Sequence, residues 1–155
     1  MVGAMNIFAL DLDPIMAAEM HVDKHIVKMP LESAQMLCTL NAPNAPYKPT
    51  HINHPCTLWA GATSGNYDWL VRLGLALCDE YTHRYGKEHK CQAVIEKLRS
   101  PPASVPVGPL TSFALAMPDE CKHDDAVQAY RRYYRTHKAH LGTWKRRKRP
   151  GWMDA

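Results

Sequence analysis

The sequence predicts an all-α fold, a compact bundle of about four to five helices. Apolar residues recur at helical spacing in several segments, clusters of proline and glycine separate those segments, and only the N-terminal stretch alternates in the manner of a strand. The chain has 155 residues, of which 46% are hydrophobic and 22% charged, so it can bury one hydrophobic core without disulfide bonds or a structural metal. We therefore expect residues 1–155 to form a single helical domain with a basic, aromatic C-terminal segment.

The N-terminal part of the chain predicts a long first helix. Residues 5–12 alternate weakly and suggest a short strand or an extended lead-in. Asp13 followed by Pro14 is typical of a helix N-cap with proline at the first helical position. We expect this helix to reach about Leu40. Pro30 should either kink it or start a second helical piece, because proline lacks an amide donor and clashes with the preceding turn.

Further helices are expected at intervals along the rest of the chain. Helical patterns cover residues 55–59, 66–81, 88–98 and 119–141. The intervening residues 101–109 contain several prolines and predict a loop.

The cysteines and the apolar segments exclude several classes of protein. The five cysteines are odd in number and widely spaced, so they predict reduced thiols and not a disulfide framework or a zinc knuckle. No segment has the pattern of a secretory leader or approaches the roughly eighteen apolar residues of a membrane span. We therefore expect a cytoplasmic protein that makes no contact with a membrane.

The formal charge of +4 is unevenly distributed. Residues 122–149 contain ten Lys and Arg against two Asp, a local net charge of +8, whereas residues 1–121 carry a net charge of −3. A concentrated basic segment attracts polyanions by long-range steering and counterion release. The C-terminal segment therefore predicts binding to nucleic acid or another phosphate-bearing ligand, with a solvated basic tail as the alternative.

The first predicted helix carries a polar face of unusual composition. At spacings of 4, 3, 4 and 3 residues, this face holds His21, His25, Lys28, Glu32 and Gln35. Surface helices normally carry Glu, Lys and Arg, so two histidines in register with Lys, Glu and Gln favour a site. The alternative is an ordinary wet surface, because a break at Pro30 would destroy the register.

A stiff loop follows this helix. Pro49 and Pro55 limit its backbone freedom. Its side chains can donate or accept hydrogen bonds to phosphates or base edges, and the candidates are Lys48, Thr50, His51, Asn53 and His54. The alternative is that Thr50 and Asn53 only cap the next helix. Histidines of the helix and the loop could also meet at a transition metal, but their spacing is not diagnostic, so we expect neither a metal nor a cofactor.

Two aromatic and basic clusters complete the candidate set. Arg84 and Tyr85 stand before a glycine and could clamp or stack on a ligand, although a helix C-terminus explains them as well. The strongest indication of nucleic-acid binding is the run YRRYYR, from which we select Arg131, Arg132 and Tyr134 as ligand contacts. Its alternative is a surface helix whose tyrosines pack inward.

Five segments together resemble one known family. They are MNIFALDLDP, HVDKHIVKMPLESAQML, YKPTHINHP, EYTHRYGKEH and FALAMPDECK, the last followed by AYRRYY. This pattern resembles a family of small helical proteins of tailed bacteriophages and some bacteria, often without an assigned function or labelled pyrimidine-dimer DNA glycosylase of the endonuclease V type. Membership would place the protein in the host cytoplasm if a phage encodes it.

The resemblance implies roles for particular residues. The repair enzyme of this type flips out a base, attacks the sugar with its N-terminal amine and uses a Glu on its first long helix, for which Glu32 is the matching carboxylate. The start of the family pattern, Met5 and Asn6, departs from that mechanism, because a Met before Asn is usually retained. Lys24 or Lys28 would then be the substitute amine.

These observations lead to three hypotheses for function. The first is a DNA glycosylase and AP-lyase-like enzyme that acts on a nucleotide N-glycosidic bond, with Glu32, Lys28 and Lys24 as catalytic residues. The second is a non-catalytic phage protein that sequesters nucleic acid or a nucleotide signal. The third is a metal-dependent helical nuclease. All three predict DNA or a nucleotide as the partner.

Overall fold

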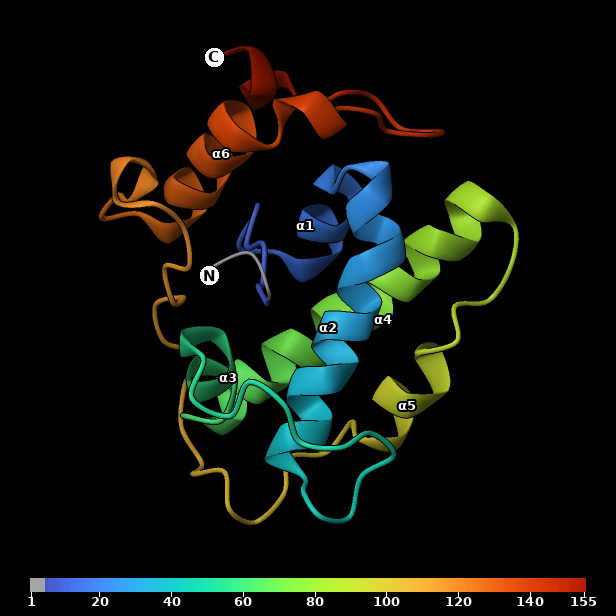
Figure 1. Cartoon of the computed structure of the whole chain (residues 1–155), viewed down its shortest axis with the longest axis vertical. Helices are drawn as coiled ribbons and strands as arrows, with labels where there is room; N and C mark the ends of the chain where they lie inside the picture. The colour runs from blue at the N-terminus through green and yellow to red at the C-terminus, as the bar shows by residue number, and fades with distance from the viewer. Residues whose placement is uncertain (1–4) are drawn as a thin grey trace.

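A computed structural model describes residues 5–155, which form a bundle of α-helices with no strand in that range (Figure 1). The prediction of an all-α fold is confirmed. The helices are α1 (Pro14–Met20), α2 (Asp23–Leu40), α3 (Pro55–Ala60), α4 (Ser64–Tyr85), α5 (Gln92–Lys97) and α6 (Ala126–His137). No helix in the described part of the chain is both long and apolar enough to cross a membrane.

Of the two alternatives expected for residues 5–12, the extended lead-in is correct and the short strand is not, because these residues have no partner strand in the described chain. The segment is instead an extended strip of core in which Ile7, Phe8 and Leu10 are all buried. Its backbone groups find other partners: the Ile7 amide donates to the Asn6 side chain at 2.8 Å, and Arg131 donates to the Leu10 carbonyl at 2.8 Å. The segment therefore connects α2 with α6.

The predicted helix over residues 14–40 is two helices, and the break lies at His21 and Val22, not at Pro30. Asp13 caps α1 as expected, and both residues of the break have extended backbone angles. Side chains from distant segments satisfy the groups that the break frees, because Arg84 donates to the His21 carbonyl and the Tyr134 hydroxyl accepts from the Val22 amide. Pro30 is buried inside α2 and does not end it.

Helix α4 is longer than the predicted 66–81, whereas the helices predicted over residues 88–98 and 119–141 are shorter in the structure. Before α5, the His89 ring accepts a hydrogen bond from the Cys91 amide, so residues 88–91 are not helical. The expected helix over residues 119–141 is interrupted because Asp125 caps α6 and separates it from a short 3-10 turn at residues 119–121. A second 3-10 turn covers residues 139–141. The predicted loop at 101–109 has no helix or strand.

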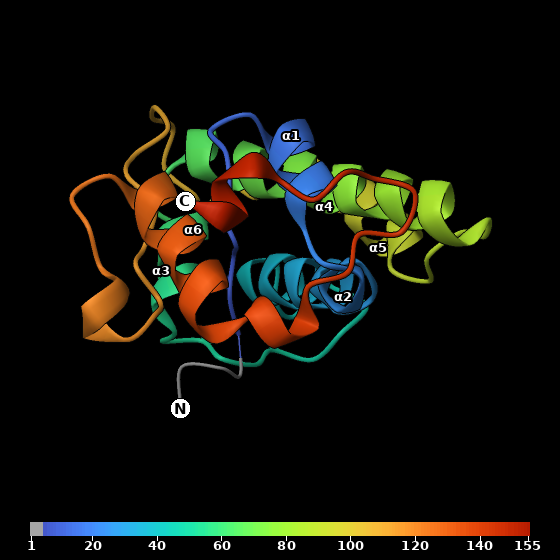
Figure 2. The ribbon, with the colours of Figure 1, turned by 90° about the horizontal axis from the view of Figure 1, so that it is seen from above.

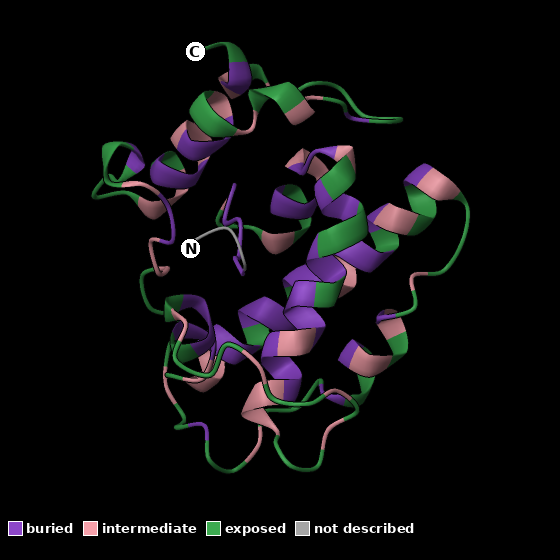
Figure 3. Ribbon diagram, in the orientation of Figure 1, coloured by how far each residue is buried: buried purple, intermediate pink, exposed green. Residues whose placement is uncertain are grey.

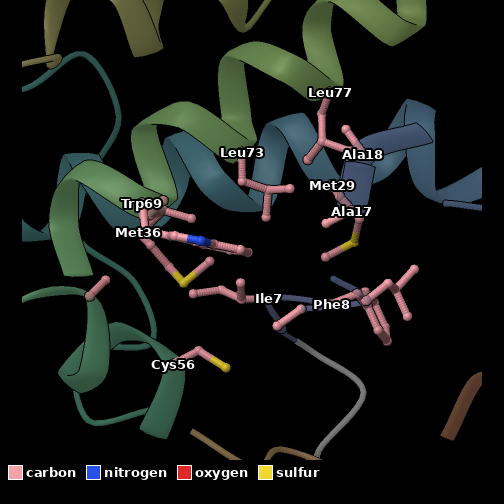
Figure 4. Packing of buried hydrophobic residues seen from close by; sticks show 14 of the residues in the cluster. Ile7, Phe8, Ala17, Ala18, Met29, Met36, Cys56, Trp69, Leu73 and Leu77 are labelled. Carbon is pink, nitrogen blue, oxygen red and sulfur yellow. The ribbon is translucent and has the colours of Figure 1, made fainter. Parts of the chain in front are cut away.

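The hydrophobic core lies where α2 and α4 cross and the N-terminal segment packs against them. Figure 4 shows Met29 and Met36 from α2 facing Leu73 and Leu77 from α4, with Ile7 beside them. Buried surface lies on the inward faces of α2, α4 and α6, as Figure 3 shows by colour.

The C-terminal segment after α6 runs over the helices and does not extend into solvent. Figure 2 shows it crossing α1 and α4. The Trp144 indole donates to the Met20 carbonyl at 2.8 Å, the Asp23 amide donates to the Thr143 carbonyl at 2.9 Å, and Arg147 pairs with Glu80 at 2.9 Å. We call residues 143–149 the basic strap. Its anchors fix it at the junction of α1 and α2.

Candidate active site around Glu32

Glu32 is a buried carboxylic acid at the centre of the site. Glu32 is only 4% exposed, and one of its carboxylate oxygens accepts a 2.7 Å hydrogen bond from the Asn6 main-chain amide. The other oxygen lies 3.5 Å from Nζ of Lys28, one turn earlier on α2. Burial raises the pKa of Glu32, opposed by the Asn6 hydrogen bond and the Lys28 charge. Glu32 can therefore hold a proton at higher pH than a free carboxyl group can.

A small pocket opens beside this carboxyl group. Three segments form it: the N-terminal strip, α2 and the end of α6. The lining residues are Asn6, Phe8, His25, Lys28, Met29, Glu32, Tyr133 and Lys138. Its volume of about 30 Å³ suits a water molecule and is too small for a nucleobase. A larger ligand would lie at the mouth and present one reacting atom to Glu32.

His25 forms one wall of the pocket and is held in a single orientation. Its Nδ1 lies 2.7 Å from the Tyr134 hydroxyl, and the Phe8 ring stacks on it at a centroid distance of 4.5 Å. The Tyr134 hydroxyl accepts from the Val22 amide at 3.3 Å, which leaves its proton free to be donated to Nδ1 of His25. This arrangement favours the tautomer with a proton on Nε2.

The charge state of His25 is also fixed. Burial lowers its pKa to about 2, and the charges of His21, Lys138 and Lys28 act in the same direction. The imidazole is therefore neutral at physiological pH. It can donate a hydrogen bond from Nε2 without bringing a positive charge into the pocket.

The Tyr134→Phe substitution should release this ring. Without the hydroxyl, the Val22 amide and Nδ1 of His25 lose their partner in a buried place, so we expect a loss of about 1–3 kcal/mol of stability. The nitrogen-15 shifts of His25 should show the Nε2-protonated tautomer in the parent protein and a mixture in the variant. Tyr85→Phe is the control, since the Tyr85 hydroxyl makes no hydrogen bond within residues 5–155. Equal tautomer populations in parent and Tyr134→Phe would contradict the proposed role of Tyr134.

The other members of the predicted polar face lie apart from the pocket. His21 is fully buried in the break, where its Nδ1 donates to the Ala17 carbonyl at 2.6 Å, and burial lowers its pKa to about 4. Lys24 is exposed and Gln35 is half-buried, and neither lines the pocket. The structure therefore brings together His25, Lys28 and Glu32, but not His21, Lys24 or Gln35.

The predicted loop is stiff, but its side chains have local partners. Thr50 exchanges two hydrogen bonds with Thr39, at 3.0 and 2.9 Å, and its hydroxyl lies 2.9 Å from Nδ1 of His51. His51 has a φ of 50°, and its ring is 6.3 Å from that of His54.

The loop does cap the next helix, but through His54 and not through Thr50 or Asn53. The ring of His54 accepts from the Cys56 amide at 3.0 Å and caps α3, so neither Thr50 nor Asn53 is the cap. Burial lowers the pKa of His54. Lys48 and Asn53 are exposed, and no residue of the loop lines the Glu32 pocket.

Arg84 is a structural residue, which corrects its prediction as a ligand contact. Its side chain has no exposed surface, and it donates to Glu80 at 2.7 Å and to Asp23 at 2.9 Å. Two main-chain carbonyls at the α1–α2 break also accept from it. Tyr85 is half-buried, with Nζ of Lys145 5.2 Å from its ring centroid.

The tyrosines of the YRRYYR run, residues 130–135, pack into the core, which is the alternative that the sequence left open. Tyr134 is fully buried at His25, so it cannot stack on a base in this conformation. Arg131 pairs with Asp11 at 3.2 Å and lies 5.3 Å from the Trp152 ring centroid. Arg132 is half-buried and donates to the Lys122 carbonyl at 3.4 Å.

Besides the apolar residues Phe8 and Met29, sequence reasoning missed three pocket residues with hydrogen-bonding groups, namely Asn6, Tyr133 and Lys138. They reach Glu32 and His25 from parts of the chain about a hundred residues apart. Helical spacing reports only neighbours on one element, so it carries no signal for these contacts. Among residues 5–155 no three His, Cys, Asp or Glu side chains gather in a way that could hold a metal ion.

Comparison with known proteins places the N-terminal part of the chain in a known family. The sequence model of the family described as pyrimidine dimer DNA glycosylase matches residues 5–93, more than half of the chain. The matched range contains Asn6, His25, Lys28 and Glu32 and ends before α6. No curated protein and no solved structure matches the chain. The chain belongs to the pyrimidine dimer DNA glycosylase family.

Proposed function

We propose that the protein is a DNA glycosylase with AP-lyase activity, which cleaves the N-glycosidic bond of a nucleotide in DNA at the Glu32 pocket. The observation that carries this proposal is a buried carboxyl group of raised pKa beside two amines, Lys28 and Lys138, in one pocket. Perturbed ionisable groups that converge in a pocket are characteristic of catalytic sites. Family membership supports DNA as the substrate.

The chemistry of the reaction matches what Glu32 can do. Breaking a glycosidic bond places negative charge on the departing base and positive charge on the sugar. A protonated carboxyl group can supply a proton to the base, and the resulting carboxylate stabilises the sugar cation and can accept the C2′ proton during strand cleavage. The raised pKa of Glu32, caused by its burial, favours the protonated form that can give a proton to the departing base.

The neutral imidazole of His25 fits the same reaction. Its Nε2 proton is available to a carbonyl oxygen of the departing base or to a sugar or phosphate oxygen at the pocket mouth. A hydrogen bond from a neutral donor stabilises developing negative charge without competing with Lys28 for Glu32.

The basic strap is the best surface for the DNA backbone. Lys145, Arg146 and Lys148 are exposed and form no ion pair within residues 5–155, unlike Arg147, which pairs with Glu80. The Lys145 amide donates to the Asp23 carboxylate at 2.8 Å, at the start of α2, and the same helix carries Lys28 and Glu32 into the pocket. Each phosphate neutralised on the strap would release counterions and make binding sensitive to salt.

A strand-cleavage assay combined with borohydride trapping tests the proposed function. We expect the protein to cleave a glycosidic bond in ultraviolet-irradiated duplex DNA and to nick the strand there, and to form a covalent adduct with abasic DNA in the presence of borohydride, since a lyase of this kind passes through an imine. Undamaged duplex DNA of the same sequence is the control. DNA that is bound but recovered unchanged, with no glycosidic bond cleaved, would identify a binding protein and overturn the proposal.

A further inference from the structure

We propose that Lys138, at the C-terminal end of α6, is the amine that forms the imine with the sugar, in place of Lys28 or Lys24. The inference rests on the proposed function, because an imine forms only if the protein acts on the sugar. It concerns a residue beyond the matched range of 5–93 and one to which the polar face of α2 gives no clue.

The geometry separates the three lysines. Lys138 is half-buried, lines the Glu32 pocket and holds its Nζ 5.2 Å from the centroid of the Tyr133 ring. Lys28 also lines the pocket, but its side chain is 58% exposed and pairs with Glu32. Lys24 is exposed and lies outside the pocket. Only Lys138 both lines the pocket and forms no ion pair within residues 5–155.

The surroundings of Lys138 suit a nucleophilic amine. An amine attacks only when it is unprotonated, and partial burial lowers the pKa of Lys138, as does the nearby positive charge of Lys28, while Glu32 acts in the opposite direction. Lys28 bears most directly on Glu32, since the two form an ion pair. Lys28 is therefore held by its ion pair with Glu32, and Lys138 is the amine of the pocket that can supply the lone pair.

The main chain of Lys138 is held at the end of α6. Lys138 is the C-cap of this helix, and its amide donates to the Tyr134 carbonyl at 3.0 Å. The Tyr134 hydroxyl lies 2.7 Å from Nδ1 of His25. Tyr134 therefore contacts both His25 and the main chain of Lys138, which line the same pocket.

The reaction balances with groups that the pocket holds. The lone pair of the Lys138 amine forms a bond to C1′ of the sugar while the bond from C1′ to the base breaks, and the base leaves with that electron pair and takes the Glu32 proton. The attached nitrogen loses a proton, the bond between C1′ and O4′ opens, O4′ is protonated and the iminium forms. Loss of the C2′ proton to the Glu32 carboxylate then expels the 3′ phosphate, and water later hydrolyses the imine.

The test is to locate the borohydride adduct on the intact protein. Abasic duplex DNA would be trapped on the parent protein and on Lys138→Arg, Lys28→Arg and Lys97→Arg. Arginine keeps the charge and length but does not act as a nucleophile under these conditions. Lys97, exposed on α5 and outside the Glu32 pocket, is the matched control. We expect loss of the adduct in Lys138→Arg alone, with DNA binding retained.

Peptide mapping of the parent adduct gives an independent measurement. A sugar on Lys138 would block tryptic cleavage there and leave a modified peptide that spans residues 136–145. An adduct on Lys28 or on an α-amine would overturn the inference while the proposed function stands. No adduct and no glycosidic bond cleavage by the parent would overturn the proposed function itself. If Lys138→Arg fails to fold, the mapping of the parent protein decides alone.

Discussion

Glu32→Gln is expected to abolish glycosidic bond cleavage and strand cleavage while the protein stays folded. General acid–base catalysis by a positioned side chain contributes roughly 10²–10⁴-fold, so the rate of glycosidic bond cleavage should fall by at least about 10²-fold. The amide oxygen of glutamine can still accept from the Asn6 amide, as the Glu32 carboxylate does at 2.7 Å. The substitution therefore removes the titrating group and leaves the hydrogen bond that fixes the side chain.

Stability should respond to Glu32→Gln in a direction set by the pKa. Because the folded-state pKa of Glu32 is raised above 4.5, the stabilisation of the protonated form is fully present below that value and is lost as the pH rises through the folded-state pKa. Glutamine carries no such dependence. We therefore expect Glu32→Gln to gain stability relative to the parent as the pH is raised, with thermal unfolding as the measurement.

Glu88→Gln is a suitable control for both measurements. Glu88 is exposed and lies outside the Glu32 pocket, so this variant should keep full activity and the melting behaviour of the parent. Glu32→Gln with undiminished glycosidic bond cleavage would remove Glu32 from the reaction. Glu32→Gln that no longer folds would assign the carboxyl group to the architecture of the N-terminal strip.

The fold was predictable from the sequence wherever local chemistry decides the structure. Asp13 and Pro14 begin α1 as expected, and Gly86, with a φ of 72°, ends α4 in the left-handed region that glycine adopts without strain. The break at His21 and Val22 was not predictable. Its free amide and carbonyl groups are satisfied by Arg84 and Tyr134, about 60 and 110 residues away, and no pattern in residues 14–40 reports such partners.

The site was predictable to a similar extent. Helical spacing on α2 correctly grouped His25, Lys28 and Glu32, because all three lie on the face that borders the pocket. It also included His21, which the break moves into the core. Lys138 and its neighbours on α6 reach the pocket through tertiary packing, which the composition of the basic segment does not describe.

Arg84→Met should be the most destabilising single substitution among those considered. Arg84 is the centre of a buried network in which its guanidinium contacts Glu80 and Asp23, while Arg147 of the strap contacts Glu80 at 2.9 Å. Methionine fills much of the same space but leaves buried carboxylates without their main partner. Breaking a buried ion pair from one side costs about 3–5 kcal/mol. The melting temperature should therefore fall by roughly 6–20 °C.

The exposed pair of Arg72 and Asp68 gives a matched control on the same helix. Its two side chains lie 3.0 Å apart and are 68% and 57% exposed, so Arg72→Met should cost at most about 1 kcal/mol. The contrast tests burial, because both variants remove an arginine that pairs with an acid four residues before it on α4. Equal melting temperatures for the two variants would show that the buried network contributes no stability.

Acid should remove the difference between the parent and Arg84→Met. Burial alone would raise the pKa of Glu80, but hydrogen bonds from Arg147 and Arg84 and their charges hold it below its usual value of 4.5. A depressed pKa contributes stability that is present above 4.5 and is lost as the pH falls through the folded-state pKa. The melting temperatures of the parent and Arg84→Met, measured from pH 7 to pH 3, should therefore become equal at the acidic end. A gap that stays constant over this range would assign the loss in Arg84→Met to packing and not to the ion pairs.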